Sequence, residues 1–198
     1  MRILLVLFDL LVGLIVFGKD HKRTFNLLIN RLQTKKLLQD FKSHFNAGYL
    51  SEAEKIANLL PKPYQVKSIE KIIKRYIKKG WGWFNEAQNT ANLSLKEPLR
   101  TRWLEKILKK CISKGSLNKA QEIANLLKRE LTKEELEKIL KKNIKGGWLT
   151  EAKETVRLLK RELKREEILK IYDIQNKSRF RFKEIKETVG FLIEKFSG

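Results

Sequence analysis

A six-residue pattern occurs four times along the chain, as Gly48-Tyr-Leu-Ser-Glu-Ala53, Gly82-Trp-Phe-Asn-Glu-Ala87, Gly115-Ser-Leu-Asn-Lys-Ala120 and Gly147-Trp-Leu-Thr-Glu-Ala152. A more diverged copy near the C-terminus contains Ile185 at the position of the alanine. The column Ala53, Ala87, Ala120, Ala152 and Ile185 is therefore spaced by 34, 33, 32 and 33 residues. Units of this length cannot bury their apolar faces alone, so a regular period of this kind indicates units that stack on one another.

Each unit predicts two helices. In the first helix apolar residues recur at helical spacing, for example at Trp103, Leu104, Ile107 and Leu108. The glycine of the pattern is expected to end this helix in a left-handed cap, and the alanine to let the second helix approach closely. Side chains two residues before each alanine are suited to cap the second helix, and these are Ser51, Asn85, Asn118 and Thr150.

The sequence thus predicts an all-α fold, an α-solenoid of about five stacked helix-turn-helix repeats with an extra N-terminal apolar helix. We divide the chain into residues 1–18 (apolar helix), 19–32 (leading helix) and 33–198 (helical-repeat domain). The expected helix pairs cover residues 33–60, 66–95, 99–130, 132–162 and 164–196.

The Gly-x-Leu-x-Glu-Ala step resembles the turn and second helix of tetratricopeptide and pentatricopeptide repeats, over about residues 33–196. The resemblance implies a right-handed stack of helix pairs. It also implies a protein that binds peptides, proteins or RNA, because helical-repeat proteins rarely catalyse a reaction. We transfer no ligand residue from these repeats to this chain.

The composition leaves little room for enzyme chemistry. The chain has 198 residues with a single cysteine, Cys111, and two histidines, His21 and His44. It contains neither a phosphate-binding glycine loop nor a nucleophile or zinc motif. We therefore expect no catalytic residue, no metal and no cofactor, and we interpret Cys111 as a small residue of the core.

The formal net charge of +21 is concentrated on the first helices. Residues 66–79 and residues 99–114 each contain six basic residues and one acidic residue, whereas the second helices are close to neutral. The basic residues recur in three aligned columns: Lys71, Lys106 and Lys138; Lys74, Lys109 and Lys141; Arg75, Lys110 and Lys142. Stacked first helices would place these columns in one strip that binds a polyanion or an acidic protein segment, although lysine-rich faces are often only solvated.

Aromatic residues follow the glycines of the pattern, notably Trp83 and Trp148. They could stack on unpaired bases or contact a peptide, although such rings more often pack against the next repeat.

The N-terminal segment is almost wholly apolar from Ile3 to Phe17 and is followed by several basic residues. We interpret it first as a membrane attachment that leaves the repeat domain cytoplasmic, because basic residues tend to stay on that side. The alternatives are a helix that caps the first repeat of a soluble cytoplasmic protein, and a cleaved signal.

We carry two functional hypotheses from the sequence. The first is a non-catalytic helical-repeat scaffold that binds a protein partner through an acidic segment. The alternative is a protein that binds single-stranded RNA with the basic helix face, using Trp83 and Trp148 as stacking platforms.

Overall fold

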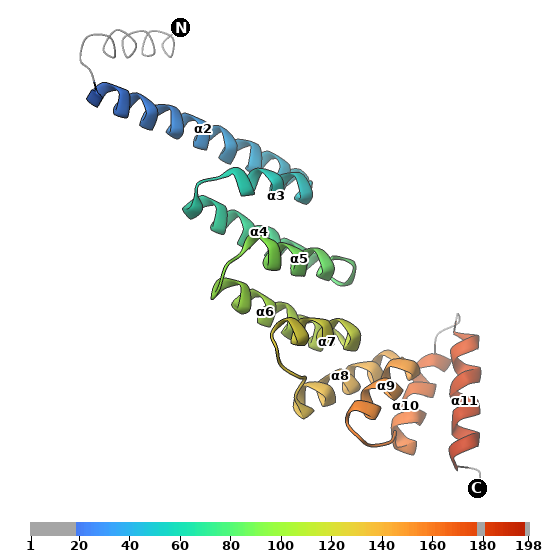
Figure 1. The fold of residues 1–198 in the computed structure, drawn as a ribbon. Coiled ribbons are helices and arrows are strands. Elements are labelled where there is room, and N and C mark those ends of the chain that lie inside the picture. The colour runs from blue at the N-terminus through green and yellow to red at the C-terminus, as the bar shows by residue number, and fades with distance from the viewer. Residues whose placement is uncertain (1–18, 178–180, 197–198) are drawn as a thin grey trace. The chain divides into compact units, whose positions relative to one another are not determined.

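The computed structural model describes residues 19–177 and 181–196. These residues form ten α-helices and one short 3-10 helix, with no strand among them (Figure 1). The elements are α2 (Lys19–Ala47), α3 (Leu50–Leu59), α4 (Lys62–Lys79), η1 (Trp81–Trp83), α5 (Phe84–Ser94), α6 (Leu99–Lys114), α7 (Leu117–Leu126), α8 (Lys133–Gly146), α9 (Leu149–Leu158), α10 (Arg165–Asn176) and α11 (Phe182–Phe196). Consecutive helices pack in pairs, which confirms the predicted all-α, solenoid-like fold.

Residues 19–32 and the first helix of the first pair belong to one continuous helix, α2. The predicted apolar helix over residues 1–18 lies outside the described residues. No helix within the described ranges is both long enough and apolar enough to cross a bilayer.

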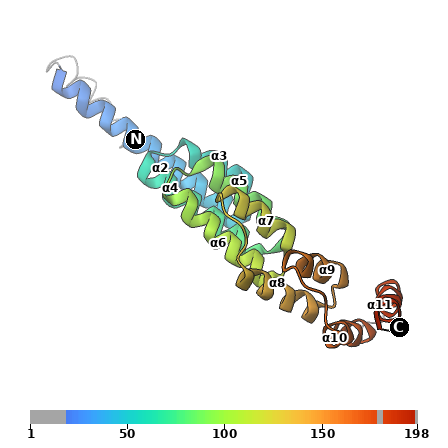
Figure 2. The same ribbon diagram turned by 60° about the horizontal axis from the view of Figure 1, so that its bottom comes forward.

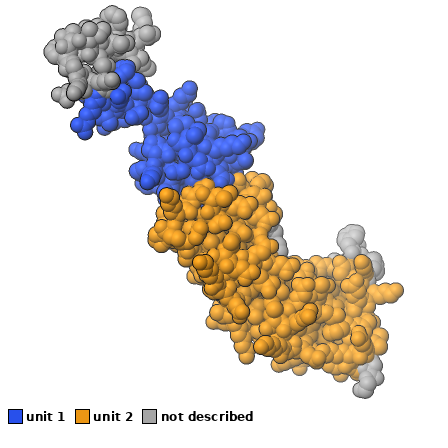
Figure 3. All heavy atoms as spheres, in the orientation of Figure 1, with its two compact units in different colours: residues 1–75 blue, residues 76–198 orange. Residues whose placement is uncertain are grey.

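The chain divides into two compact units, residues 1–75 and residues 76–198 (Figure 3). In the first unit α2 packs against α3. The rings of Phe41 and Phe45 stack with their centroids 5.6 Å apart, and the guanidinium of Arg75 lies 5.3 Å from the ring centroid of Phe45. An arginine over an aromatic ring gains a cation–π attraction, so Arg75 contributes to packing within this unit.

In the second unit the first helices lie side by side in chain order. Helix α8 contacts α6 on one side and α10 on the other, while α7, α9 and α11 each pack against the first helix of their own pair (Figures 1 and 2). An apolar cluster joins α8, α9 and α10 through Leu140, Leu149, Ala152, Val156, Leu163, Ile168 and Ile171. This unit therefore has the stacking that the repeat period predicts.

The alanines of the repeat pattern are completely buried. Ala53, Ala87, Ala120 and Ala152 all have a relative exposure of 0%. A methyl group at this position lets the two helices of a pair approach closely, which confirms the packing role inferred for the four alanines. Ile185, at the same position of the fifth repeat, is only half-buried.

The glycines that end the first helices are Gly48, Gly80, Gly115 and Gly147, with φ angles between 71° and 100°. The prediction was wrong for the second repeat, where Gly82 was aligned with the other glycines. Gly80 takes the left-handed position there, and Gly82 lies in η1. Two additional residues between Gly80 and Trp83 form this 3-10 turn, so the glycine of the repeat pattern and the glycine that ends the helix are different residues.

The predicted N-caps of the second helices were also wrong. These helices begin two residues earlier than expected, at Leu50, Phe84, Leu117 and Leu149, so the polar residues lie inside the first turn. The residues at the N-cap positions make no side-chain cap hydrogen bond. The leading leucine or phenylalanine is buried instead, so apolar packing rather than side-chain capping fixes the start of each second helix.

Candidate functional site

A basic hollow lies in the groove between α6 and α8 of the second unit. It has a volume of about 540 Å³, and we call it the lysine groove. It is lined by Lys109, Ile112, Ser113, Glu135, Lys138, Lys141, Lys142 and Lys145. Lysine side chains cover such a surface with their hydrocarbon stems and keep their ammonium groups in water, so the groove combines apolar walls with a positively charged rim.

Four of the nine predicted basic residues line this groove: Lys109, Lys138, Lys141 and Lys142. Their arrangement follows from helix geometry, because residues three and four apart lie on one face. Lys145 continues the face of α8 by one more turn but was not predicted, because the matching position of the preceding repeat holds Ser113. Because no lysine stands at that position in the preceding repeat, the alignment gave no column for Lys145. Its spacing of four residues from Lys141 could have identified it.

The other predicted cations lie elsewhere. The ammonium group of Lys106 is 4.1 Å from the ring centroid of the buried Trp103, and Lys110 is half-buried outside the groove lining. Exposed residues of α4 in the first unit make up the remainder, namely Lys71, Lys74 and Arg75. The first-helix columns thus contribute to the groove only where α6 and α8 are adjacent.

Most ammonium groups of the lysine groove have no counterion among residues 19–177 and 181–196. Lys138 pairs with Glu134 across one helical turn, with a distance of 2.7 Å between nitrogen and oxygen. Lys109, Lys141, Lys142 and Lys145 form no ion pair with any residue in the described ranges. The positive potential of the groove is therefore available to an external anion.

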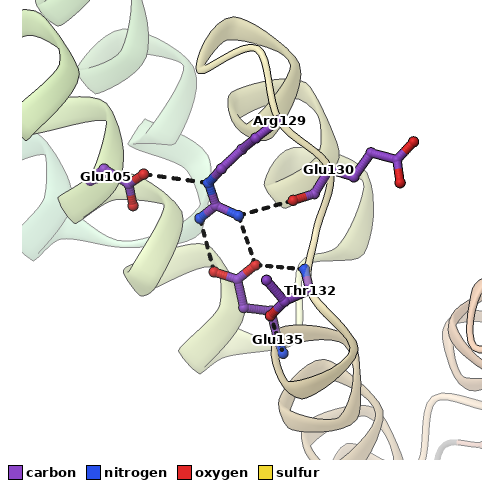
Figure 4. Close-up of polar contacts among 5 residues, drawn as sticks. All are labelled: Glu105, Arg129, Glu130, Thr132 and Glu135. Atoms are coloured by element: carbon purple, nitrogen blue, oxygen red, sulfur yellow. Dashed lines mark hydrogen bonds and ion pairs between the residues drawn. The ribbon is translucent and has the colours of Figure 1, made fainter.

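The one carboxylate in the groove lining is neutralised by an arginine. Arg129, in the linker after α7, donates two parallel hydrogen bonds to Glu135, both 2.9 Å long (Figure 4). It also donates to Glu105 of α6 at 3.4 Å and to the backbone carbonyl of Glu130 at 3.0 Å. The hydrogen bonds that Glu135 accepts from Arg129 lower the pKa of its carboxyl below the usual value. Because Glu135 is ionised and paired with Arg129, it does little to offset the lysines.

This interaction, which we call the arginine clamp, joins α6 to α8 and recurs one repeat later. Arg161 binds Glu167 of α10 at 3.0 Å and Glu137 of α8 at 3.4 Å. Partial burial opposes ionisation of Glu167, but the hydrogen bonds from Arg161 and the backbone of Lys164 lower the pKa of its carboxyl. The two clamps hold α6, α8 and α10 in register and so fix the width of the grooves between them.

The arginine clamps were not predicted. Their signal is present in the sequence, because Arg129-Glu130-Leu131 followed by Glu135 recurs 32 residues later as Arg161-Glu162-Leu163 followed by Glu167. The prediction considered lysines within helices and overlooked arginines in the linkers.

The groove between α8 and α10 has mixed charge. Its volume is about 460 Å³, and it shares Lys138, Lys141 and Lys145 with the lysine groove. Three carboxylates face it as well, from Glu134, Glu137 and Glu167. Positive charge is therefore concentrated between α6 and α8.

Neither of the two predicted tryptophan platforms is part of the lysine groove lining. Trp83 is 38% exposed and stacks on Tyr76, with ring centroids 5.6 Å apart and the ammonium group of Lys79 4.0 Å from its ring. Trp148 lines a separate hollow together with Glu151 and Glu154. Trp83 and Trp148 thus lie apart from the lysine groove.

Cys111 is completely buried, as expected for a core residue, and burial raises the pKa of its thiol to about 12. No group of three or more His, Cys, Asp or Glu residues within the described ranges could hold a metal ion.

The chain matches no protein-family model, and neither the curated proteins nor the solved structures contain a significant match.

Proposed function

We propose that this chain is a non-catalytic interaction scaffold whose lysine groove binds an acidic segment of a protein partner. The observation that carries the proposal is the set of four lysines around one hollow, none of which forms an ion pair with a residue that the structure describes. Carboxylates of a partner would neutralise these ammonium groups, and apolar side chains between them would contact the hydrocarbon walls.

The dimensions of the groove support a short extended segment. The lysines of α8 extend from Lys138 to Lys145, a rise of about 10 Å at 1.5 Å per residue. An extended peptide covers this distance with about three residues, since it rises roughly 3.3 Å per residue. Acidic residues at alternate positions would therefore meet successive turns of α8.

Binding of single-stranded RNA is the alternative. The exposed Trp83 beside Lys79 favours it, because an indole with a neighbouring cation suits a base and its phosphate. We prefer the protein partner because the lysine groove has no aromatic side chain in its lining on which bases could stack. Membrane attachment through residues 1–18 stays a prediction of the sequence.

Fluorescence polarisation with two labelled probes tests the proposal. The probes are an acidic peptide of alternating Glu and Leu and an oligouridine of similar net charge. We expect the peptide to bind more tightly at about 0.15 M salt, where long-range attraction is screened. Tighter binding of the oligouridine, with a steep salt dependence, would instead favour the RNA alternative.

Two variants of equal net charge identify the site. Lys109→Ala, Lys141→Ala and Lys145→Ala together should weaken peptide binding about tenfold, because each exposed contact contributes roughly 0.5 kcal/mol. The control replaces three exposed lysines outside the groove, Lys55, Lys183 and Lys186, by alanine. Equal losses in both variants would mean that net charge alone attracts the peptide.

A further inference from the structure

A second hollow in the same unit has the opposite charge. It has a volume of about 440 Å³ and lies between the α6–α7 turn and the start of α9. We call it the Trp148 pocket. It is lined by Gly115, Ser116, Leu117, Asn118, Trp148, Glu151 and Glu154. An indole and two carboxylates therefore meet in one hollow of a chain whose net charge is +21.

The walls of this pocket are fixed by two glycines. A Cβ atom on Gly146 would come within 2.8 Å of the Trp148 ring, so the half-buried indole rests directly on the backbone of α8. Gly115, with a φ of 82°, leaves room for Asn143, whose Oδ1 would lie 2.5 Å from a Cβ atom there. The indole is thus held in place before any ligand arrives, which lowers the cost of binding.

The electrostatics of the pocket favour a cation. Glu151 and Glu154 are exposed, lie three residues apart on one face of α9, and pair with no cation in the described part of the chain. Behind Gly115, the fully buried Asn143 has an Oδ1 atom that accepts no hydrogen bond from the residues the structure describes. An acceptor oxygen without a donor adds to the negative potential that the two carboxylates create.

Comparison with the preceding repeat shows that the pocket is not a simple product of duplication. The positions of Trp148, Glu151 and Glu154 correspond to Ser116, Lys119 and Glu122. There the ammonium group of Lys119 binds the carboxylate of Glu122. In the later repeat a carboxylate, Glu151, occupies the position of Lys119, and an indole occupies the position of Ser116. No cation of the described residues pairs with Glu151 or Glu154, so the negative charge of this pocket is open to an external cation.

We infer that the Trp148 pocket binds the guanidinium group of an arginine side chain presented by a partner protein. A guanidinium is planar and weakly hydrated, so it stacks on an indole face while its N–H groups donate to carboxylates. An ammonium group lacks this planar face and is more strongly hydrated. The inference does not depend on the lysine groove, because the two hollows have different linings.

Nuclear magnetic resonance of the full chain tests the inference through the indole N–H signal of Trp148, assigned with Trp148→Phe. The probe is N-acetyl-arginine amide, and the citrulline analogue is its neutral isostere. We expect the arginine compound to shift the Trp148 signal at millimolar concentration and the citrulline analogue to leave it unchanged. Equal shifts with both compounds, or none with either, would overturn the inference.

Charge-matched variants and other amines complete the experiment. Glu151→Gln with Glu154→Gln should weaken arginine binding about tenfold, whereas Glu184→Gln with Glu187→Gln, two exposed carboxylates of α11, should change it less than about twofold. N-acetyl-lysine amide should bind more weakly than the arginine compound. Tighter binding of the lysine compound or of free spermidine would refute a guanidinium site.

Discussion

The arginine clamp at Arg129 provides the sharpest test of the repeat packing. We consider Arg129→Met, which keeps the apolar stem but removes the hydrogen bonds to Glu105 and Glu135. The side chains of Arg129 and Glu135 are 30% and 19% exposed, so their interaction is intermediate between a surface ion pair and a buried one. Surface pairs contribute up to about 1 kcal/mol, and breaking a buried pair costs about 3–5 kcal/mol. We therefore expect a loss of about 2 kcal/mol.

Urea unfolding followed by circular dichroism measures this loss in the full chain. The matched control is Arg165→Met, which removes an exposed arginine of α10 that makes no ion pair within the described residues and should cost less than about 0.5 kcal/mol. In a double-mutant cycle, Glu135→Gln should remove most of the effect of Arg129→Met. If Arg129→Met were as stable as the control variant, the clamp would not be holding α6 against α8.

The same variant links stability to binding. Without Arg129, the carboxylate of Glu135 stays in the lysine groove and loses its partner. It would then compete with an acidic ligand for the lysines, so we expect peptide affinity to fall about threefold, by about 0.6 kcal/mol.

Three further predictions concern other parts of the chain. The free energy of unfolding should fall as the pH drops below about 4.5, because Glu135 and Glu167 have a lower pKa in the folded than in the unfolded chain and must take up protons on unfolding. Unfolding curves at several pH values check this, and a free energy of unfolding that rises as acid is added would contradict it. Lys128→Gly should stabilise the chain by about 0.5–1 kcal/mol, because Lys128 has a φ of 54°, a left-handed conformation that glycine adopts without strain. The midpoint of urea unfolding measures the change in stability, and a destabilised variant would refute the prediction. The thiol of Cys111 should react with a thiol reagent only at the rate of unfolding, because it is completely buried and its pKa is about 12. Rapid labelling of the native chain would contradict this packing.

The sequence predicts the helix pairs and their order because the alanine column reports a packing constraint that the first four repeats share, whereas the fifth has the half-buried Ile185 at this position. A methyl group is required wherever two helices meet closely, so Ala53, Ala87, Ala120 and Ala152 keep the period even where the glycine does not. The exception at Gly82 arises because the turn can accept two additional residues without disturbing the helices on either side.

The candidate site could be predicted only in part. Helix geometry places Lys138, Lys141 and Lys142 on one face, which a one-dimensional pattern reveals. The position of the Lys106 ammonium over Trp103 depends on side-chain torsions, and the arginine clamps depend on how the linkers cross between helices. Such contacts require the three-dimensional packing. The repeat alignment shows Glu151 and Glu154 near Trp148 in the sequence. It does not show that the turn between α6 and α7 forms a pocket with them, which only the structure reveals.

A charge-swap binding measurement tests the proposed function most directly. The groove variant carries Lys109→Glu and Lys141→Glu, and a control variant of equal net charge carries Lys183→Glu and Lys186→Glu. Each variant is titrated with the acidic peptide and with a basic peptide in which lysine replaces each glutamate. We predict that the groove variant loses the acidic peptide and gains affinity for the basic one, while the control retains the binding of the unchanged chain. Equal behaviour of the two variants toward both peptides would contradict a binding site in the lysine groove.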